Sequence, residues 1–124
     1  MQVAYDKHSL IVNGKREFIK SGAFHYFRTP GVELAKDRFM KLKAAGYNTV
    51  DIYFNANYHS KEENQYDFGD SVCSLGLPDL QQLSDIKDVK KILQVAKDVG
   101  LFVIARPGPF INAEVNAGGL PFWL

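Results

Sequence analysis

Apolar residues recur at three- and four-residue steps in two segments of this chain, which is the spacing of a helix with one buried face. In the first segment the apolar face comprises Val32, Ala35, Phe39, Leu42 and Ala45. In the second it comprises Ile86, Val89, Ile92, Leu93, Ala96 and Val99. Gly46 and Gly100 follow these segments, and glycine is common just past a helix end. The pattern predicts helices over about residues 32–45 and 85–99.

Three short apolar runs lack this spacing and predict strands. They cover residues 21–27, 48–54 and 101–105, so strands and helices alternate along the chain. That order predicts parallel strands joined by right-handed crossovers. Near the N-terminus, Asn13-Gly14 between alternating apolar residues indicates a hairpin turn. Residues 1–20 are therefore predicted to form a β-ribbon that packs on the larger domain.

The alternation fits a doubly wound sheet or a (β/α)8 TIM-type barrel, and both place function at the carboxyl ends of the strands. A GxGxxG phosphate loop is absent from the sequence, which favours the barrel over a dinucleotide fold. Three strands do not close an eight-stranded barrel, and the outer two would expose unpaired edges. We therefore expect residues 21–124 to form the first part of a barrel, with about three strands and two helices.

Composition excludes several classes of function. A net charge of +1, with the basic residues scattered, gives no footprint for nucleic acid or an anionic membrane. The single cysteine, Cys73, excludes a disulfide within the chain and a cysteine-based metal site. The three histidines stand far apart without HxH or HExxH spacing, so no metal site is predicted. Residues 1–12 do not resemble a signal peptide, and the localisation stays open.

The segment from Arg106 to Leu124 is the strongest candidate for a site. Prolines and glycines bound a loop that carries Asn112, Glu114 and three aromatic residues, Phe110, Phe122 and Trp123. Such a loop at a strand end is typical of the wall of a sugar-binding cleft. Glu114 is either an acceptor for sugar hydroxyls, an acid or base, or a solvated loop residue. The aromatic residues are more readily interpreted as core than as sugar-stacking platforms.

Polar residues also follow the other two strands. Asp51 and Tyr53 point to the same side of their strand, and a buried Asp51 would need a partner, for which Arg106 is placed. His25 and His59 are candidates for cleft lining, although a hydrogen-bonded scaffold role is the more common one for a histidine near a strand end.

Three stretches of the chain resemble the opening of glycoside hydrolase family 35, the β-galactosidases. They are SGAFHYFRTP at 21–30, LKAAGYNTVDIYF at 42–54 and ARPGPFINAEVNAGGLPFWL at 105–124. The resemblance runs from about Asp6 to Leu124, and its third stretch is highly specific.

The resemblance implies a (β/α)8 barrel that hydrolyses terminal non-reducing β-D-galactose residues with retention of configuration and without a cofactor. It implies that Tyr53, Asn112, Ala113 and Glu114 belong to the galactose subsite. The family's acid/base and nucleophile glutamates follow the fourth and seventh strands, beyond Leu124. No catalytic residue is therefore expected in this chain, which alone should be inactive and need the remainder of the barrel. The family also suggests an extracellular or lysosome-like compartment.

Two segments depart from the family pattern. Residues 55–61 replace a common Pro-Trp-Asn-x-His-Glu-Pro run, which predicts a different wall beside the second strand. Residues 69–85 are interpreted as an insertion. Three other functions stay open: a non-catalytic galactoside-binding protein, a piece that takes its remaining strands from a separate chain, and a related hydrolase acting on another sugar.

Overall fold

The predicted alternation forms a three-stranded parallel sheet in a computed structural model, which describes residues 1–69 and 85–124. The strands are β4 (Ser21–Phe24), β5 (Thr49–Phe54) and β6 (Phe102–Pro107), in the order β4-β5-β6. Both pairings are parallel, as the sequence predicts. The predicted insertion, apart from its end residues, and Cys73 lie outside the described residues.

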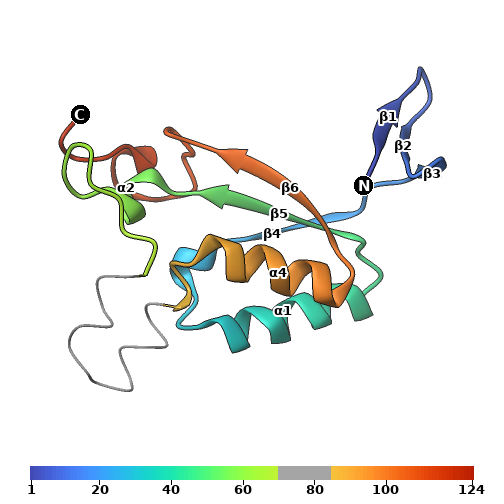
Figure 1. The fold of residues 1–124 in the computed structure, drawn as a ribbon, viewed down its shortest axis with the longest axis horizontal. Coiled ribbons are helices and arrows are strands. Elements are labelled where there is room, and N and C mark those ends of the chain that lie inside the picture. The colour runs from blue at the N-terminus through green and yellow to red at the C-terminus, as the bar shows by residue number, and fades with distance from the viewer. Residues whose placement is uncertain (70–84) are drawn as a thin grey trace.

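Two helices, α1 (Val32–Ala44) and α4 (Val89–Val99), cover one face of this sheet (Figure 1). The second helix was predicted from residue 85, but α4 begins at Val89. The reason is local, because the Asp88 side chain accepts hydrogen bonds from the backbone N–H groups of Lys90 and Lys91 and so caps the helix start.

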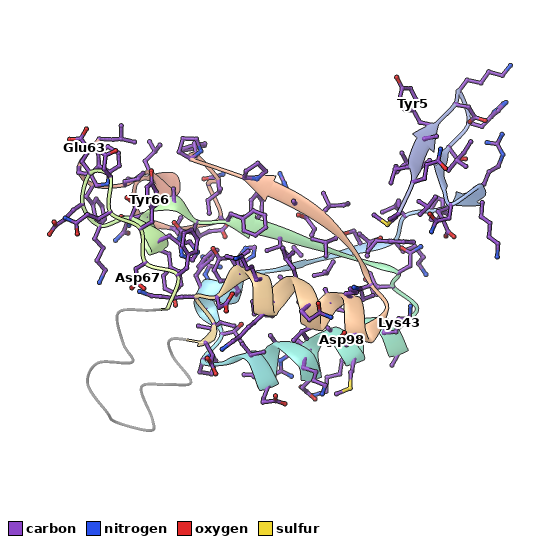
Figure 2. The ribbon with its side chains drawn as sticks, in the orientation of Figure 1. Tyr5, Lys43, Glu63, Tyr66, Asp67 and Asp98 are labelled. Atoms are coloured by element: carbon purple, nitrogen blue, oxygen red, sulfur yellow. The ribbon has the colours of Figure 1, made fainter. Side chains whose placement is uncertain are left out.

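The capping glycines stand where the sequence places them. Gly46 and Gly100 have φ of 84° and 78°, the left-handed conformation that ends a helix. Lys43 Nζ donates to the Gly100 carbonyl at 2.6 Å and ties the end of α1 to the end of α4. Figure 2 labels Lys43 and Asp98 at these neighbouring helix ends.

The core lies between the sheet and the two helices. Its buried residues are Phe24, Tyr26, Ala35, Phe39, Val50, Ile52, Ile86, Ile92, Ala96 and Leu101. The rings of Phe24 and Phe39 meet edge to face at 4.8 Å between centroids. Gly22 allows α1 to approach β4, since a Cβ there would lie 2.7 Å from Leu42 Cδ2. Each large apolar side chain buried here contributes about 1.5–3 kcal/mol.

The first strand of the sheet is shorter than predicted. The sequence predicts a strand to Phe27, but β4 stops at Phe24 and a 3-10 turn, η1 (Tyr26–Arg28), follows. The turn buries Tyr26 completely. The Tyr26 hydroxyl accepts a hydrogen bond from Asn55 N at 3.3 Å and lies 2.6 Å from His59 Nε2. Burying the ring with its hydroxyl partnered explains the early end of the strand.

His59 is a buried scaffold residue. Its Nδ1 lies 2.9 Å from the Asp67 carbonyl, which only accepts, so Nδ1 carries the proton and Nε2 of the neutral ring accepts from Tyr26. Burial is the main reason that the pKa of His59 lies below its usual value. Burial likewise raises the pKa of Tyr26 well above its usual value. The scaffold interpretation of His59 is therefore confirmed.

The N-terminal β-ribbon forms as predicted. It comprises β1 (Val3–Tyr5), β2 (Leu10–Val12) and β3 (Lys15–Glu17), all antiparallel. Asn13 and Gly14 both have positive φ, which suits a tight hairpin turn. In Figure 1 the ribbon stands at the far end of the molecule from the C-terminus. Asn48 ties the following segment to the sheet by donating to the Phe18 carbonyl and accepting from Lys20 N. Packing of the ribbon on a larger barrel stays a prediction.

The C-terminal segment packs beside the short helix that follows β5. These elements are α2 (Ala56–His59) and the 3-10 turn η3 (Asn116–Gly119), and they lie together at the carboxyl end of the sheet (Figure 1). Trp123 Nε1 donates to Ser60 Oγ at 3.2 Å. No helix of the described residues is both long and apolar enough to cross a membrane.

Gly119→Ala should disturb this packing more than Gly14→Ala disturbs the ribbon. Both glycines have positive φ, but a Cβ at Gly119 would lie 2.8 Å from Ile111 Cγ1, whereas a Cβ at Gly14 meets nothing within 4 Å. We expect a loss of about 1 kcal/mol for Gly14→Ala and about 2–4 kcal/mol for Gly119→Ala. Thermal unfolding of the two variants measures the difference, and equal losses would contradict the close contact.

His59 should make stability depend on pH. Its folded pKa lies below the usual value of 6.5, so its stabilising contribution is full above pH 6.5 and is lost as pH falls toward the folded pKa. We expect His59→Gln to flatten the fall in melting temperature between about pH 7.5 and about pH 5. His8→Gln, on the exposed ribbon, is the control and should keep the slope of the unsubstituted protein. Equal slopes for both variants would refute the assignment.

Candidate functional site

The carboxyl ends of the three parallel strands meet at one edge of the sheet. There η1 follows β4, α2 follows β5, and the loop from Gly108 to Leu124 follows β6 (Figure 1). Two of the residues predicted to bind substrate, Tyr53 and Asn112, line one hollow of about 410 Å³ at this edge. Arg106, Pro107, Phe110 and Ile111 complete its lining. The sheet therefore brings together side chains that are 59 positions apart, from 53 to 112.

Tyr53 is held between two neighbours. The β5–β6 register places it opposite Arg106, whose guanidinium carbon lies 4.0 Å from the centre of the tyrosine ring. The His25 ring meets the same tyrosine edge-on, with 5.6 Å between ring centroids. A guanidinium stacked on a ring attracts it and restricts its rotation. The Tyr53 ring is thus fixed before any ligand arrives.

Arg106 is itself anchored by Asp51. Arg106 Nη1 donates to Asp51 Oδ2 at 3.2 Å, which confirms the predicted partner of this carboxylate. The Asp51 side chain is 20% exposed, whereas that of Arg106 is 46% exposed. The pair joins β5 to β6 through Asp51, two residues before Tyr53, and is structural, as the sequence predicts.

Asn112, Ala113 and Glu114 form a left-handed turn. Their φ angles are 61°, 47° and 48°, although none of them is glycine. Each such residue costs about 1–3 kcal/mol and persists only where the surroundings impose it. Val115 N donates to the Asn112 carbonyl at 3.1 Å, and Ile111 N donates to the Gly118 carbonyl at 2.8 Å, closing the base of the loop. Strain of this kind clusters at functional sites.

Arg28 holds the outer part of this turn. Its Nη2 donates to the carbonyls of Ala113 and Glu114, the second at 3.2 Å. Its Nη1 lies 3.9 Å from Glu114 Oε2. The sequence patterns assigned Arg28 no role. Only the parallel packing of the sheet reveals that residue 28 reaches residue 114.

The four predicted site residues differ in exposure. Tyr53 is half-buried and Ala113 is buried, whereas the Glu114 side chain is 85% exposed and does not line the hollow. An ion pair as exposed as Arg28–Glu114 contributes little to stability. The Glu114 carboxylate is therefore accessible to a ligand.

The aromatic residues of this segment are exposed, so their interpretation as core of the chain is wrong. Phe110 and Phe122 are 63% and 69% exposed, and Trp123 is 37% exposed. The Phe110 ring lies against the backbone of Gly118, where a Cβ would be 2.1 Å from Phe110 Cε2. Phe110 thereby becomes one wall of the hollow instead of a buried residue.

Residues 55–61, which depart from the family pattern, contain the short helix α2. Asn55 begins it, because its side chain accepts from Tyr58 N at 3.4 Å. His59 packs inward, and its ring stacks on Phe68 with 4.7 Å between centroids. Across residues 1–69 and 85–124, no group of three or more His, Cys, Asp or Glu side chains is placed to hold a metal ion.

Comparison with known proteins identifies a family that includes this edge of the sheet. Residues 9–124 match the model of the family described as glycosyl hydrolases family 35. "Probable beta-galactosidase C" of Aspergillus flavus is 47% identical over 121 residues, which cover 98% of this chain and 11% of that protein. "Probable beta-galactosidase B" of Sclerotinia sclerotiorum is 42% identical over 123 residues, 99% of this chain and again 11% of that protein.

The family match includes the ends of β5 and β6 and the loop after β6, which line the hollow, and also η1, which carries Arg28. The chain spans about a ninth of the length of the curated relatives it matches. Its sequence and these matches show that the chain belongs to glycosyl hydrolases family 35.

Proposed function

We propose that this chain is the first part of the catalytic barrel of a retaining β-galactosidase, and that Tyr53, Asn112, Ala113 and Glu114 form part of its galactose subsite. The observation that carries the proposal is the shared hollow of Tyr53 and Asn112 at the carboxyl ends of β5 and β6, in a chain of this family. The relatives are named as probable β-galactosidases, which suggests the sugar and the linkage for this chain.

The chemistry of these side chains suits a sugar. The Asn112 amide both donates and accepts hydrogen bonds, and the Glu114 carboxylate accepts from hydroxyl groups. A hydrogen bond from a hydroxyl to a carboxylate is stronger than one between neutral groups. Because the left-handed turn fixes the backbone of Asn112 and Glu114, and the stacked Arg106 fixes the Tyr53 ring, binding loses less conformational entropy than at a loose site.

The polar atoms on the sheet face turned away from α1 and α4 support the proposal that the chain is part of a barrel. Ser21 Oγ, His25 Nδ1 and Asp51 Oδ1 are buried without a hydrogen-bond partner among the described residues. Ser21 and Asp51 lie on β4 and β5, and His25 contacts Tyr53, so all three belong to the same region of the sheet. In a closed barrel this face is the interior, where further strands supply side chains as partners.

The bond-breaking groups belong to other parts of the proposed enzyme. A retaining glycosidase uses two carboxyl groups about 5–5.5 Å apart, one as nucleophile and one as acid/base. We assign both to strands beyond Leu124, in line with the family resemblance. Glu114 then holds a galactose hydroxyl, and hydrogen bonds that strengthen in the transition state raise kcat.

Glu114→Gln tests the subsite in the full-length protein that carries this chain. The substitution keeps the shape of the side chain and removes its charge, so kcat/KM for an aryl β-galactoside should fall about tenfold to a hundredfold. Glu63→Gln is the matched control, since Glu63 is an exposed glutamate on the segment after α2 (Figure 2). Steady-state kinetics measures both variants.

The control should retain full activity. A Glu114→Gln enzyme as active as the Glu63→Gln enzyme would remove Glu114 from the subsite. An unsubstituted full-length protein that binds galactose without hydrolysing any galactoside would instead favour the non-catalytic alternative.

The 124-residue chain alone should not hydrolyse an aryl β-galactoside, because the proposed catalytic carboxyl groups lie outside it. The measurement is release of the aryl group by the purified chain, compared with the full-length protein at equal molar concentration. Turnover by the purified chain above a matched blank would overturn the assignment of both groups to later strands.

A further inference from the structure

We propose that Arg28 is a positioning residue that sets the orientation of the Asn112–Glu114 turn and thereby the affinity of the subsite for galactose; this rests on the proposed function. Arg28 lines none of the hollow that Tyr53 and Asn112 share. It acts through the backbone, by donating to the carbonyls of Ala113 and Glu114 from a residue 85 and 86 positions earlier in the chain.

The turn needs such a support because its own hydrogen bonds close only its base. Backbone hydrogen bonds join Ile111 and Asn112 to Gly118, and Val115 to Asn112. The two carbonyls at its crest, those of Ala113 and Glu114, accept from Arg28. A left-handed run of three non-glycine residues is held at the crest by a side chain from another strand end.

The guanidinium suits this task better than an ammonium. Its planar fork contacts two carbonyls through Nη2, and its Nη1 lies 3.9 Å from Glu114 Oε2. One side chain thus restrains both the backbone and the carboxylate of Glu114. Lysine has a single compact charge and cannot present this fork, so it keeps the charge without the geometry.

Arg28 also links the carboxyl ends of the two outer strands, β4 and β6. It lies on η1, directly after β4, while the turn follows β6, and β5 with Tyr53 lies between them. Its guanidinium packs over the Phe27 ring, 5.6 Å from the centroid, which fixes its direction. Arg28 therefore sets the spacing between Tyr53 and the turn.

Arg28→Lys and Arg28→Ala in the full-length protein test the proposal, with Arg38→Lys as control. Arg38 is an arginine on α1 that pairs with Asp37, away from the turn. We expect Arg28→Lys to lower kcat/KM for an aryl β-galactoside about tenfold to a hundredfold, mainly through KM, and to raise the inhibition constant of galactose. Arg38→Lys should match the unsubstituted enzyme.

Hydrogen exchange of the amides of residues 112–118 gives a second readout that needs no activity. Both Arg28 variants should exchange faster in this segment, while the α4 amides stay unchanged. Unchanged exchange of the turn in Arg28→Lys would overturn the proposal. So would a lower melting temperature with an unchanged KM, since that would make Arg28 merely structural. An unsubstituted protein without β-galactosidase activity would defeat the proposed function alone, and the exchange data would still decide the role of Arg28.

Discussion

The parallel pairing of β4, β5 and β6 is the constraint on which the rest of the site depends. Its register sets Tyr53 opposite Arg106 and Asp51 one step below. It also directs all three strand ends to one edge, where residues separated by up to 86 positions meet. Parallel strands require long crossover connections, and α1 and α4 supply them while burying the other face of the sheet. Without this register the hollow would lose both its tyrosine and its stacked arginine.

The polar groups at the edge are held by scaffold residues of two kinds. Tyr26 and His59 form a buried hydrogen-bonded pair that joins η1 to α2, and burial keeps the imidazole neutral. Arg28 and Arg106 act near the surface, one on the turn after β6 and the other on the ring of Tyr53. Both arginines come from the segment directly after or at the end of a strand. The residues proposed to contact the sugar are thus held in place by scaffold residues that are not proposed to contact it.

Sequence patterns predicted the elements well, because helix periodicity, capping glycines and apolar runs are local signals. They also predicted the Asp51–Arg106 pair from alternation along a strand. They failed where tertiary packing decides. β4 ends early because Tyr26 is buried with its hydroxyl partnered, and Phe110 stays exposed although its ring lies against Gly118. The left-handed turn and its contact with Arg28 have no local signature, since neither alanine nor glutamate favours positive φ.

A crystal structure of the full-length protein with galactose bound would show whether Tyr53, Asn112, Ala113 and Glu114 form the galactose subsite. We expect sugar hydroxyls to lie within hydrogen-bonding distance, about 2.6–3.2 Å, of the side chains of Asn112 and Glu114 and beside Tyr53. We expect Arg28 to contact the turn and not the sugar. Galactose bound elsewhere, with these side chains in contact only with protein or solvent, would show that they do not form the subsite.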